Sequence, residues 1–135
     1  MAGEQKATIP ATHHDIMGST AVALISTLGP HGEPQCSPVW FEWDGQLVRF
    51  SHTKDRQKYR NLLRDPRIAV TIVDPATPYR YVELRGTAAI EDDPRKLFID
   101  KMAKKYTGQD HYPDSAPGEE RVVISVTPTH VNTMG

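Results

Sequence analysis

The sequence has only one cysteine, Cys36, among its 135 residues. A single thiol cannot form an internal disulfide, and six scattered histidines without a second thiol match no zinc-ligand spacing. Long apolar runs are also missing, since none approaches the roughly 18 residues of a membrane span, and no signal pattern opens the chain. These absences exclude a disulfide scaffold, and we expect a cytoplasmic protein with no metal site and no membrane partner.

An excess of charge of either sign is missing as well. The 16 lysines and arginines face 17 aspartates and glutamates, which gives a formal net charge of -1. A balanced chain has no overall field that attracts nucleic acid, and of the aromatic residues only Tyr59 lies among the basic ones. We therefore expect no nucleic-acid partner. The length predicts a single domain, residues 1–135, because one hydrophobic core suffices for a chain of this size.

Recognisable sets of catalytic side chains are absent too. Cys36 has no histidine placed beside it, and neither a Gly-x-Ser-x-Gly elbow nor a Rossmann glycine fingerprint occurs. The pair Asp92-Asp93 fits the start of a helix better than a pair of catalytic carboxylates. The sequence therefore identifies no catalytic residue, and an enzyme with this sequence would rely on a cofactor for its chemistry.

What the sequence does contain is a local concentration of positive charge in residues 54–67. A strand ending in Ser51 is expected to pass there into a helix that begins near Asp55 and stops at Asp65-Pro66. The core face of this helix is expected to carry Tyr59, Leu62 and Leu63. Cations at a helix start cost stability because the free N–H groups already carry partial positive charge, whereas a bound phosphate would be stabilised there. The alternative interpretation is a solvated basic helix face.

Apolar patterns predict six strands. They cover residues 20–28, 35–43, 47–51, 68–73, 79–90 and 121–127. Turn residues at 29–34 and at Asp44-Gly45 predict hairpins, Pro38 predicts an edge or a bulge, and Gly86 predicts a bulge or bend. Hairpin connections with only two sizeable helices indicate a mainly β fold, a closed or split antiparallel barrel.

The remaining segments are expected to flank this barrel. Residues 1–11 are expected to form a loose N-terminal arm before a short helix over 12–17. A longer helix should run from Asp92 to Tyr106, and the Gly/Pro/Asp-rich stretch 107–119 is a candidate lid or interface loop.

Five segments, taken together and in order, resemble the pyridoxamine 5'-phosphate oxidase-like split barrels, and more narrowly the flavin/deazaflavin oxidoreductases of the B group. They are residues 28–41 (LGPHGEPQCSPVWF), 51–58 (SHTKDRQK), 60–67 (RNLLRDPR), 81–88 (YVELRGTA) and 117–124 (PGEERVVI). The resemblance covers the chain from about residue 20 to the end. It implies a six-stranded antiparallel split β-barrel of the FMN-binding kind with two to three short flanking helices. It also implies a homodimer whose cofactor, coenzyme F420 or FMN, lies at the subunit interface.

The same resemblance assigns cofactor-binding residues by position. The phosphate is expected to contact Ser51, Thr53, Arg56 and Lys58. The ring is expected to lie against Gln35, Ser37 and Val39, and Asn61 belongs to the same set. Arg80 stands where the phosphate-oxidase relatives carry a glutamine, and we assign it to the acidic tail of the cofactor.

The leading hypothesis is an F420-dependent oxidoreductase that transfers a hydride from reduced F420 to a small, electron-poor organic substrate. Residues 54–67 contain six basic residues against two acidic ones, and this surplus favours F420 because its glutamate chain continues beyond the phosphate. An FMN-binding flavin reductase or a pyridoxamine 5'-phosphate oxidase-like enzyme is the alternative, the oxidase being weaker because its C-terminal substrate pattern is missing. A cofactor- or haem-binding protein without turnover is a third hypothesis.

Overall fold

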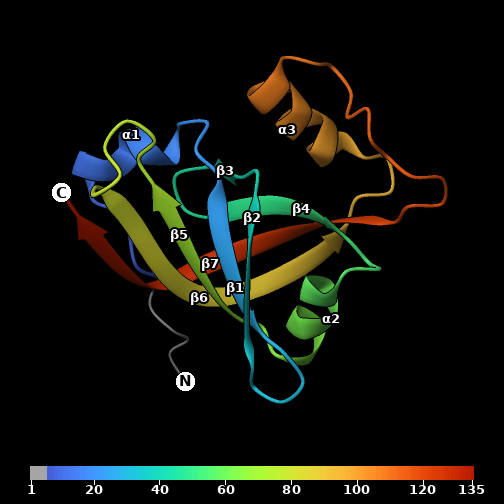
Figure 1. The fold of residues 1–135 in the computed structure, drawn as a ribbon, viewed down its shortest axis with the longest axis horizontal. Helices are drawn as coiled ribbons and strands as arrows, with labels where there is room; N and C mark the ends of the chain where they lie inside the picture. The colour runs from blue at the N-terminus through green and yellow to red at the C-terminus, as the bar shows by residue number, and fades with distance from the viewer. Residues whose placement is uncertain (1–5) are drawn as a thin grey trace.

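The computed structural model describes residues 6–135, which form one curled antiparallel sheet with helices along its margins (Figure 1). The strands are β1 (Ala23–Leu28), β2 (Pro34–Val39), β3 (Glu42–Trp43), β4 (Val48–Thr53), β5 (Arg67–Val73), β6 (Tyr81–Asp92) and β7 (Arg121–Met134). The helices are a 3-10 turn (Ala11–His13), α1 (His14–Met17), α2 (Gln57–Arg64) and α3 (Leu97–Thr107). The strand order is β2-β1-β5-β6-β7-β4-β3, so β2 and β3 are the two edges of a half-barrel. The predicted mainly β, antiparallel fold is confirmed.

The sheet has seven strands rather than six because the predicted strand over 35–43 is divided in two. β2 ends at Val39, and the chain turns through Trp40 and Phe41 into β3. The backbone of Phe41 forms hydrogen bonds with side chains of α3 instead of with a neighbouring strand. Its N–H donates to Tyr106 Oη at 3.1 Å, and its carbonyl accepts from Lys105 Nζ at 2.7 Å. Pro38 lies in the edge strand β2. Proline has no backbone N–H to donate, and an edge strand tolerates this because only one of its sides pairs with another strand.

The concave face of the sheet carries the core. Alternate residues of β1, β4, β5, β6 and β7 point into it, as the period of two in a strand requires. Its largest fully buried side chains include Phe41, Phe50, Ile25, Ile72, Leu84 and Ile124. Each such side chain contributes about 1.5–3 kcal/mol by leaving water, so this face holds the curvature of the sheet in place.

β6 bends at the position where the sequence predicted a bulge. Its register against β7 shifts between Arg85 and Gly86, and Pro128 lies opposite Gly86. Every residue of β6 pairs with β7, and for this reason β7 continues to Met134 instead of ending at the predicted residue 127.

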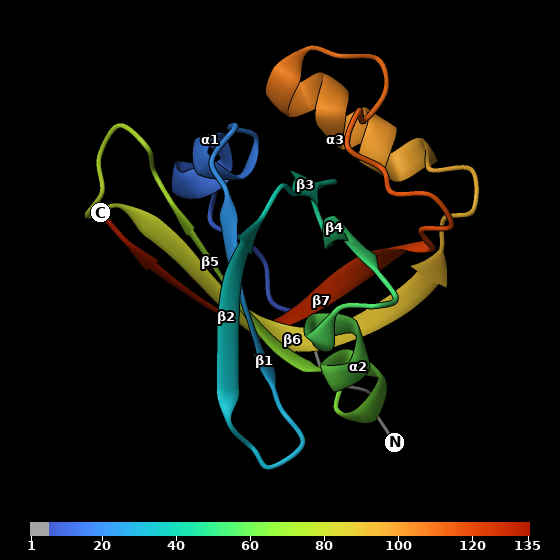
Figure 2. The same cartoon turned by 45° about the vertical axis from the view of Figure 1, so that its right-hand side comes forward.

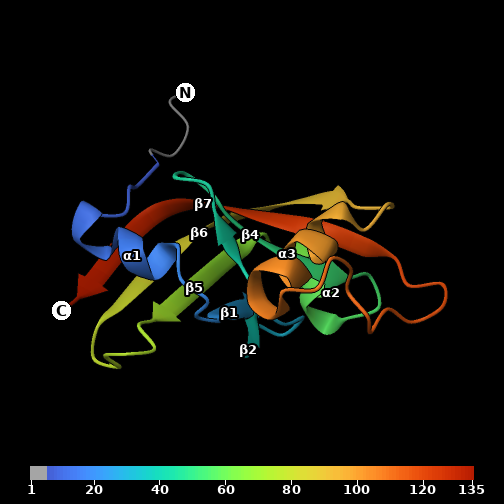
Figure 3. The ribbon, with the colours of Figure 1, turned by 90° about the horizontal axis from the view of Figure 1, so that it is seen from above.

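The N-terminal segment is attached to the sheet over its described part. Residues 1–5 of the predicted loose arm lie outside the described residues. From Ala7 onward the chain is held, since Ala7 N donates to Pro128 O at 2.9 Å and the side chain of Ile9 is buried. His13 accordingly reaches the end of β7, where its Nε2 lies 3.0 Å from the carbonyl oxygen of Met134. α1 therefore lies beside the C-terminal end of the chain, away from α2 and α3 (Figure 3).

The buried face of α2 differs from the prediction. Leu62 is buried as expected, but Leu63 is exposed, and Lys58 and Asn61 are buried instead. The reason is that α2 packs against the polar end of the β1–β2 hairpin, where Asn61 donates to Thr27 Oγ1. α3 begins later than predicted because the Asp93 carboxylate accepts hydrogen bonds from the first two backbone N–H groups of the helix.

Two kinds of feature do not occur in the part of the chain that the structure describes. No helix there is long and apolar enough to cross a membrane. No three or more histidine, cysteine, aspartate or glutamate side chains lie together so that they could hold a metal ion.

Candidate functional site

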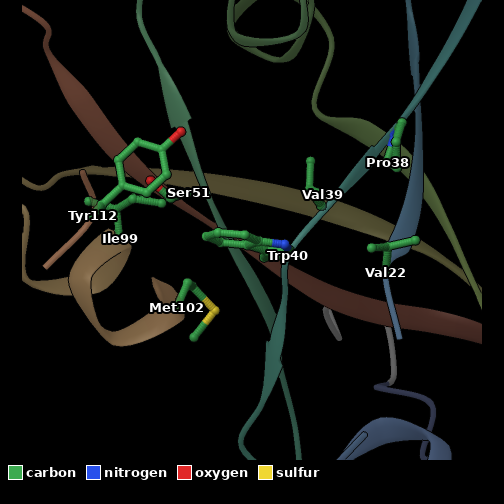
Figure 4. A pocket seen from close by; sticks show the side chains of 8 residues that line it. All are labelled: Val22, Pro38, Val39, Trp40, Ser51, Ile99, Met102 and Tyr112. Atoms are coloured by element: carbon green, nitrogen blue, oxygen red, sulfur yellow. The ribbon is translucent and has the colours of Figure 1, made fainter. Parts of the chain in front are cut away.

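The two margins of the curled sheet approach each other on one side of the molecule, with β2 on one side, β4 on the other, and α2 and α3 flanking the space between them (Figure 2). A cavity of about 310 Å³ lies there. Its lining residues are Val22, Pro38, Val39, Trp40, Ser51, Ile99, Met102 and Tyr112. Figure 4 shows Trp40 in the middle, with Ile99, Met102 and Tyr112 on one side and Pro38 and Val22 on the other. The cavity is mainly apolar and has hydroxyl groups from Ser51 and Tyr112.

The wall formed by α3 is fixed to the sheet by Tyr106. Its hydroxyl donates to Ala21 O at 2.7 Å and accepts from Phe41 N at 3.1 Å. Trp40 stacks on the Tyr106 ring with centroids 5.2 Å apart, and the Tyr112 ring meets Trp40 edge-on at 6.0 Å. The indole of Trp40 is thus held between two tyrosines, which gives the cavity a rigid aromatic wall.

A buried cation, Lys58, lies on the first turn of α2. The side chain of Lys58 is 5% exposed, and its Nζ lies 5.7 Å from the centroid of the Phe50 ring. Within residues 6–135 it forms neither an ion pair nor a hydrogen bond. Burial lowers the pKa of Lys58 to about 8; Cys36 acts in the opposite direction, and nearby Arg56 lowers the pKa further. The charge of Lys58 is thus held in a poorly solvated place without a carboxylate partner, and an anion beside it would be stabilised.

The pKa of His52 reflects the positive charges around it. Burial lowers its pKa to about 4, and the charges of Lys58, Arg56 and Arg121 lower it in the same direction. The imidazole is therefore neutral at pH 7. Three cations from two segments of the chain, the start of α2 and the start of β7, thus act on His52, and we call Arg56, Lys58 and Arg121 the cation cluster.

Ser51 connects the cation cluster to the cavity. It lines the cavity, and its Oγ accepts a hydrogen bond from Arg121 Nη1 at 3.1 Å. Thr53, two residues further along β4, is buried, and its hydroxyl donates to Asp55 Oδ1 at 2.6 Å. Arg56 is exposed and forms no ion pair within the described residues. The four residues predicted to hold a phosphate are thus brought together at one end of β4, although the Thr53 hydroxyl is already engaged.

The residues predicted to line a ring divide into two groups. Val39 lines the cavity, and Ser37 lies half-buried two residues before it. Gln35 belongs instead to a network around Asn61, whose Nδ2 donates to Gln35 Oε1 at 2.9 Å and to Thr27 Oγ1 at 3.0 Å. Asn61 is fully buried. Gln35 and Asn61 therefore help to hold α2 against the β1–β2 hairpin.

Arg80 is not brought together with the other predicted residues. Its guanidinium donates to both carboxylate oxygens of Asp15, at 2.8 and 2.9 Å, and to Asp74 at 3.1 Å. These hydrogen bonds raise its pKa and tie α1 to the loop between β5 and β6. In this chain Arg80 is committed to an ion-pair network beside the C-terminus.

Seven residues of the site were not predicted from the sequence as site residues: Val22, Pro38, Trp40, Ile99, Met102, Tyr112 and Arg121. Trp40 carried a usable signal, because it lies on the opposite face from Val39 and Phe41 in the predicted strand. Arg121 carried none, because its place beside Ser51 depends on the pairing of β4 with β7, in which Thr53 lies opposite Arg121.

The chain resembles known proteins over most of its length, in sequence and in fold. The profile of the family described as Pyridoxamine 5'-phosphate oxidase matches residues 9–135. A solved structure named F420 Reductase is 36% identical, has a TM-score of 0.83, and matches over 92% of this chain and 98% of that chain. A conserved hypothetical protein from Mycobacterium tuberculosis shares the fold at 24% identity and a TM-score of 0.74, over 98% of this chain and 89% of that chain. General Stress Protein 26 from Bacillus anthracis str. Sterne shares it at 16% identity and a TM-score of 0.65, over 90% and 89%. With both the profile and the 36% identical structure spanning nearly all of it, the chain belongs to the pyridoxamine 5'-phosphate oxidase family.

Proposed function

We propose that this chain is an oxidoreductase that uses coenzyme F420 to reduce small, electron-poor organic substrates. The observation that carries the proposal is Lys58, a buried ammonium group without a carboxylate partner in residues 6–135. The phosphate of a cofactor would supply the missing counter-charge. The name of the 36% identical structure, F420 Reductase, supports F420 as that cofactor.

The residues of the site fit a cofactor with an anionic end and a planar ring. Lys58, Arg56 and the Ser51 hydroxyl would hold the phosphate, and the cavity beside Val39 and Trp40 would accept the ring. When bound, the reduced cofactor supplies a hydride. The chain's own contribution is to orient the reactants against the rigid Trp40 wall and to exclude water from an apolar cavity.

Positive charge beyond the phosphate site favours F420 over FMN. Of the six basic residues in 54–67, Lys54 forms ion pairs with Asp92 and Glu120, and Arg67 pairs with Asp65. The other four, Arg56, Lys58, Arg60 and Arg64, form no ion pair within the described residues. A single phosphate needs fewer cations than this, whereas a chain of glutamates can use them all.

We also propose that the protein works as a homodimer with the cofactor at the subunit interface. The outward side at the start of β1 supports this, because Val22, directly before the strand, is 46% exposed and Leu24 is 37% exposed. Both line a second, largely apolar hollow of about 370 Å³ together with Pro75 and Pro78. Sedimentation at micromolar concentration with the cofactor present tests it. A monomer under those conditions would rule out a shared site.

Titration with each cofactor, followed by absorbance and by the mass of the retained ligand, tests the cofactor assignment. F420 is expected to bind more tightly than FMN. Arg56→Ala should weaken the binding of both by about tenfold, since it removes one charge-assisted contact, and should leave the free energy of unfolding unchanged. Unaltered affinities in this variant would mean that the phosphate site is misplaced.

An FMN-binding flavin reductase is the second candidate. Lys58 favours it as much as it favours F420, because one phosphate is enough to neutralise one buried ammonium group. Tighter binding of FMN than of F420 would establish this candidate in place of the first.

A further inference from the structure

Arg121, at the start of β7, makes three contacts that converge on the site. Its Nε donates to Glu119 Oε2 at 2.8 Å, and its Nη1 donates to Ser51 Oγ at 3.1 Å. Its Cζ lies 4.9 Å from the centroid of the Tyr112 ring. The side chain is only 10% exposed, so its charge acts in a poorly solvated place.

The guanidinium of Arg121 is the member of the cation cluster that contacts the cavity wall. Ser51 and Tyr112, two of its three contacts, both line the cavity. Its charge also reaches His52, on which Lys58 and Arg56 act as well. A ligand that fills the cavity beside Ser51 and Tyr112 therefore lies close to Arg121, whose charge acts on the same imidazole as the charge of Lys58.

Glu119 is the chain's own anion at this place. It lies two residues before β7 in the loop that follows α3, and its side chain is 12% exposed. Burial opposes its ionisation, but the hydrogen bond and charge of Arg121 outweigh burial and leave the pKa of Glu119 below its ordinary value. Glu119 is thus an ionised carboxylate bound to Arg121, one of the three members of the cation cluster.

We propose that Arg121 is an anion-binding residue of this site and that Glu119 occupies its guanidinium until the anionic group of a ligand replaces that carboxylate. The inference rests on the proposed function for the identity of the ligand. The exchange turns Arg121 toward the ligand and alters its contact with Tyr112, whose ring lies edge-on to Trp40. Occupation of the anion site is thereby coupled to the aromatic wall of the cavity and to the loop that carries Glu119.

Two roles of Glu119 predict opposite results. A carboxylate that competes with the ligand makes anion binding weaker, so its removal strengthens binding. A carboxylate that merely orients Arg121 makes anion binding stronger, so its removal weakens binding. The sign of one measurement therefore separates the two.

The test is a calorimetric titration of Glu119→Gln with inorganic phosphate. The matched control is Glu120→Gln, which makes the same change of charge at the next residue, where the side chain is 71% exposed and lies 3.7 Å from Lys54. We expect Glu119→Gln to bind phosphate about three- to tenfold more tightly than the control. Equal or weaker binding would overturn the proposal.

A second variant isolates Arg121. Glu119→Gln combined with Arg121→Gln avoids leaving a buried carboxylate unpaired, and it should bind phosphate about tenfold more weakly than Glu119→Gln alone. Phosphate should also change tryptophan fluorescence in a Trp43→Phe background, which reports Trp40, and this change should disappear in the double variant. A double variant that binds phosphate as tightly as Glu119→Gln would exclude Arg121 from the site.

Titrations with F420 and FMN separate this inference from the proposed function. If phosphate binding follows the expected order but neither cofactor binds, Arg121 and Glu119 act as proposed and the cofactor assignment is wrong. If F420 binds equally well to Glu119→Gln and Glu120→Gln, the cofactor assignment stands and the exchange at Arg121 is wrong.

Discussion

Gly86 lies directly against the backbone of Thr127 across the β6–β7 pair. A Cβ atom on Gly86 would lie 1.9 Å from the carbonyl oxygen of Thr127 and 2.8 Å from its carbonyl carbon, far inside van der Waals contact. The obstacle is backbone, which cannot rotate away as a side chain does. The bend that curls β6 around the core therefore depends on the absence of a side chain at this position.

Gly86→Ala should destabilise the protein strongly. We expect the free energy of unfolding, measured with urea, to fall by about 2 kcal/mol or more, because the added methyl group must displace a central strand pair. Gly18→Ala is the matched control, since a Cβ there would meet only His14 O, at 3.8 Å. Equal effects of the two substitutions would show that the close approach at Gly86 is relieved at little cost.

Lys58→Met should change stability and ligand binding in opposite directions. Replacing a buried, unpaired ammonium group by an apolar chain of similar length should raise the free energy of unfolding by about 1 kcal/mol in the absence of ligand. The affinity for F420 or FMN should fall by about tenfold or more. Lys104→Met, at a side chain that is 64% exposed, should change neither quantity appreciably. A loss of stability in Lys58→Met would mean that Lys58 is satisfied within the chain.

The lowered pKa of Lys58 predicts a pH dependence of stability. Its pKa is about 8 in the folded protein and 10.5 in an unperturbed lysine. Between these values the unfolded chain binds a proton that the folded chain has lost, so the free energy of unfolding rises with pH. The difference between the wild type and Lys58→Met should therefore become more favourable to the wild type from about pH 8 to pH 10, by at most about 1.4 kcal/mol per pH unit. A constant difference across this range would contradict the burial of a charged Lys58.

Tyr106→Phe should loosen the aromatic wall of the cavity. The substitution removes the donor to Ala21 O and the acceptor of Phe41 N, and a hydrogen bond of this kind is worth about 1 kcal/mol. We expect a fall of about 1–2 kcal/mol in the free energy of unfolding and a change in the fluorescence of Trp40, which stacks on this ring. Unchanged stability would indicate that Lys105 alone holds α3 to Phe41.

Local signals in the sequence were sufficient for the turns and for the position of most strands. Asp44-Gly45 predicted a turn, and Gly45 indeed has a φ of +96° while the Asp44 carboxylate accepts from Leu47 N at 2.7 Å. Gly86 predicted the bulge in β6. In both cases the chemistry of one or two residues determines the local backbone conformation, so this conformation could be predicted from neighbouring residues alone.

Features that depend on tertiary contacts could not be predicted in the same way. The division of the predicted strand 35–43 follows from Tyr106 and Lys105, which lie more than 60 residues later and take up the backbone of Phe41. The exposure of Leu63 and the burial of Asn61 follow from the polar end of the hairpin under α2. An apolar periodicity alone favours leucine over asparagine at a buried position, and here a hydrogen-bond network reverses that preference.

The candidate site was predicted only where its residues adjoin the β4–α2 junction. Ser51 and Lys58 are seven positions apart in one continuous segment, so the sequence alone assigns both to the same strand-to-helix junction. Arg121 reaches the same place from the far end of the chain through strand pairing, and Arg80 is drawn away by Asp15 and Asp74. Arg121 and Arg80 carry the same charge, and the sequence does not distinguish them. Their different partners in the fold place only Arg121 at the candidate site.

Cofactor binding should depend on the salt concentration. Arg56, Lys58, Arg60 and Arg64 form no ion pair within residues 6–135, and Arg60 donates only to Asp55 O at 3.0 Å and Gln57 Oε1 at 2.9 Å. If the glutamate tail of F420 engages the exposed members of this set, added salt should weaken F420 binding more steeply than FMN binding, because exposed charges are screened.

Arg60→Gln tests the same contacts without salt. It should reduce the affinity for F420 by about two- to fivefold, as expected for one exposed ion pair, and should leave the affinity for FMN unchanged. Arg67→Gln is the matched control, because Arg67 already pairs with Asp65 at 2.7 Å. Parallel salt slopes, together with equal losses for both cofactors in Arg60→Gln, would show that binding ends at the phosphate, and the surplus of charge on α2 would then no longer favour F420.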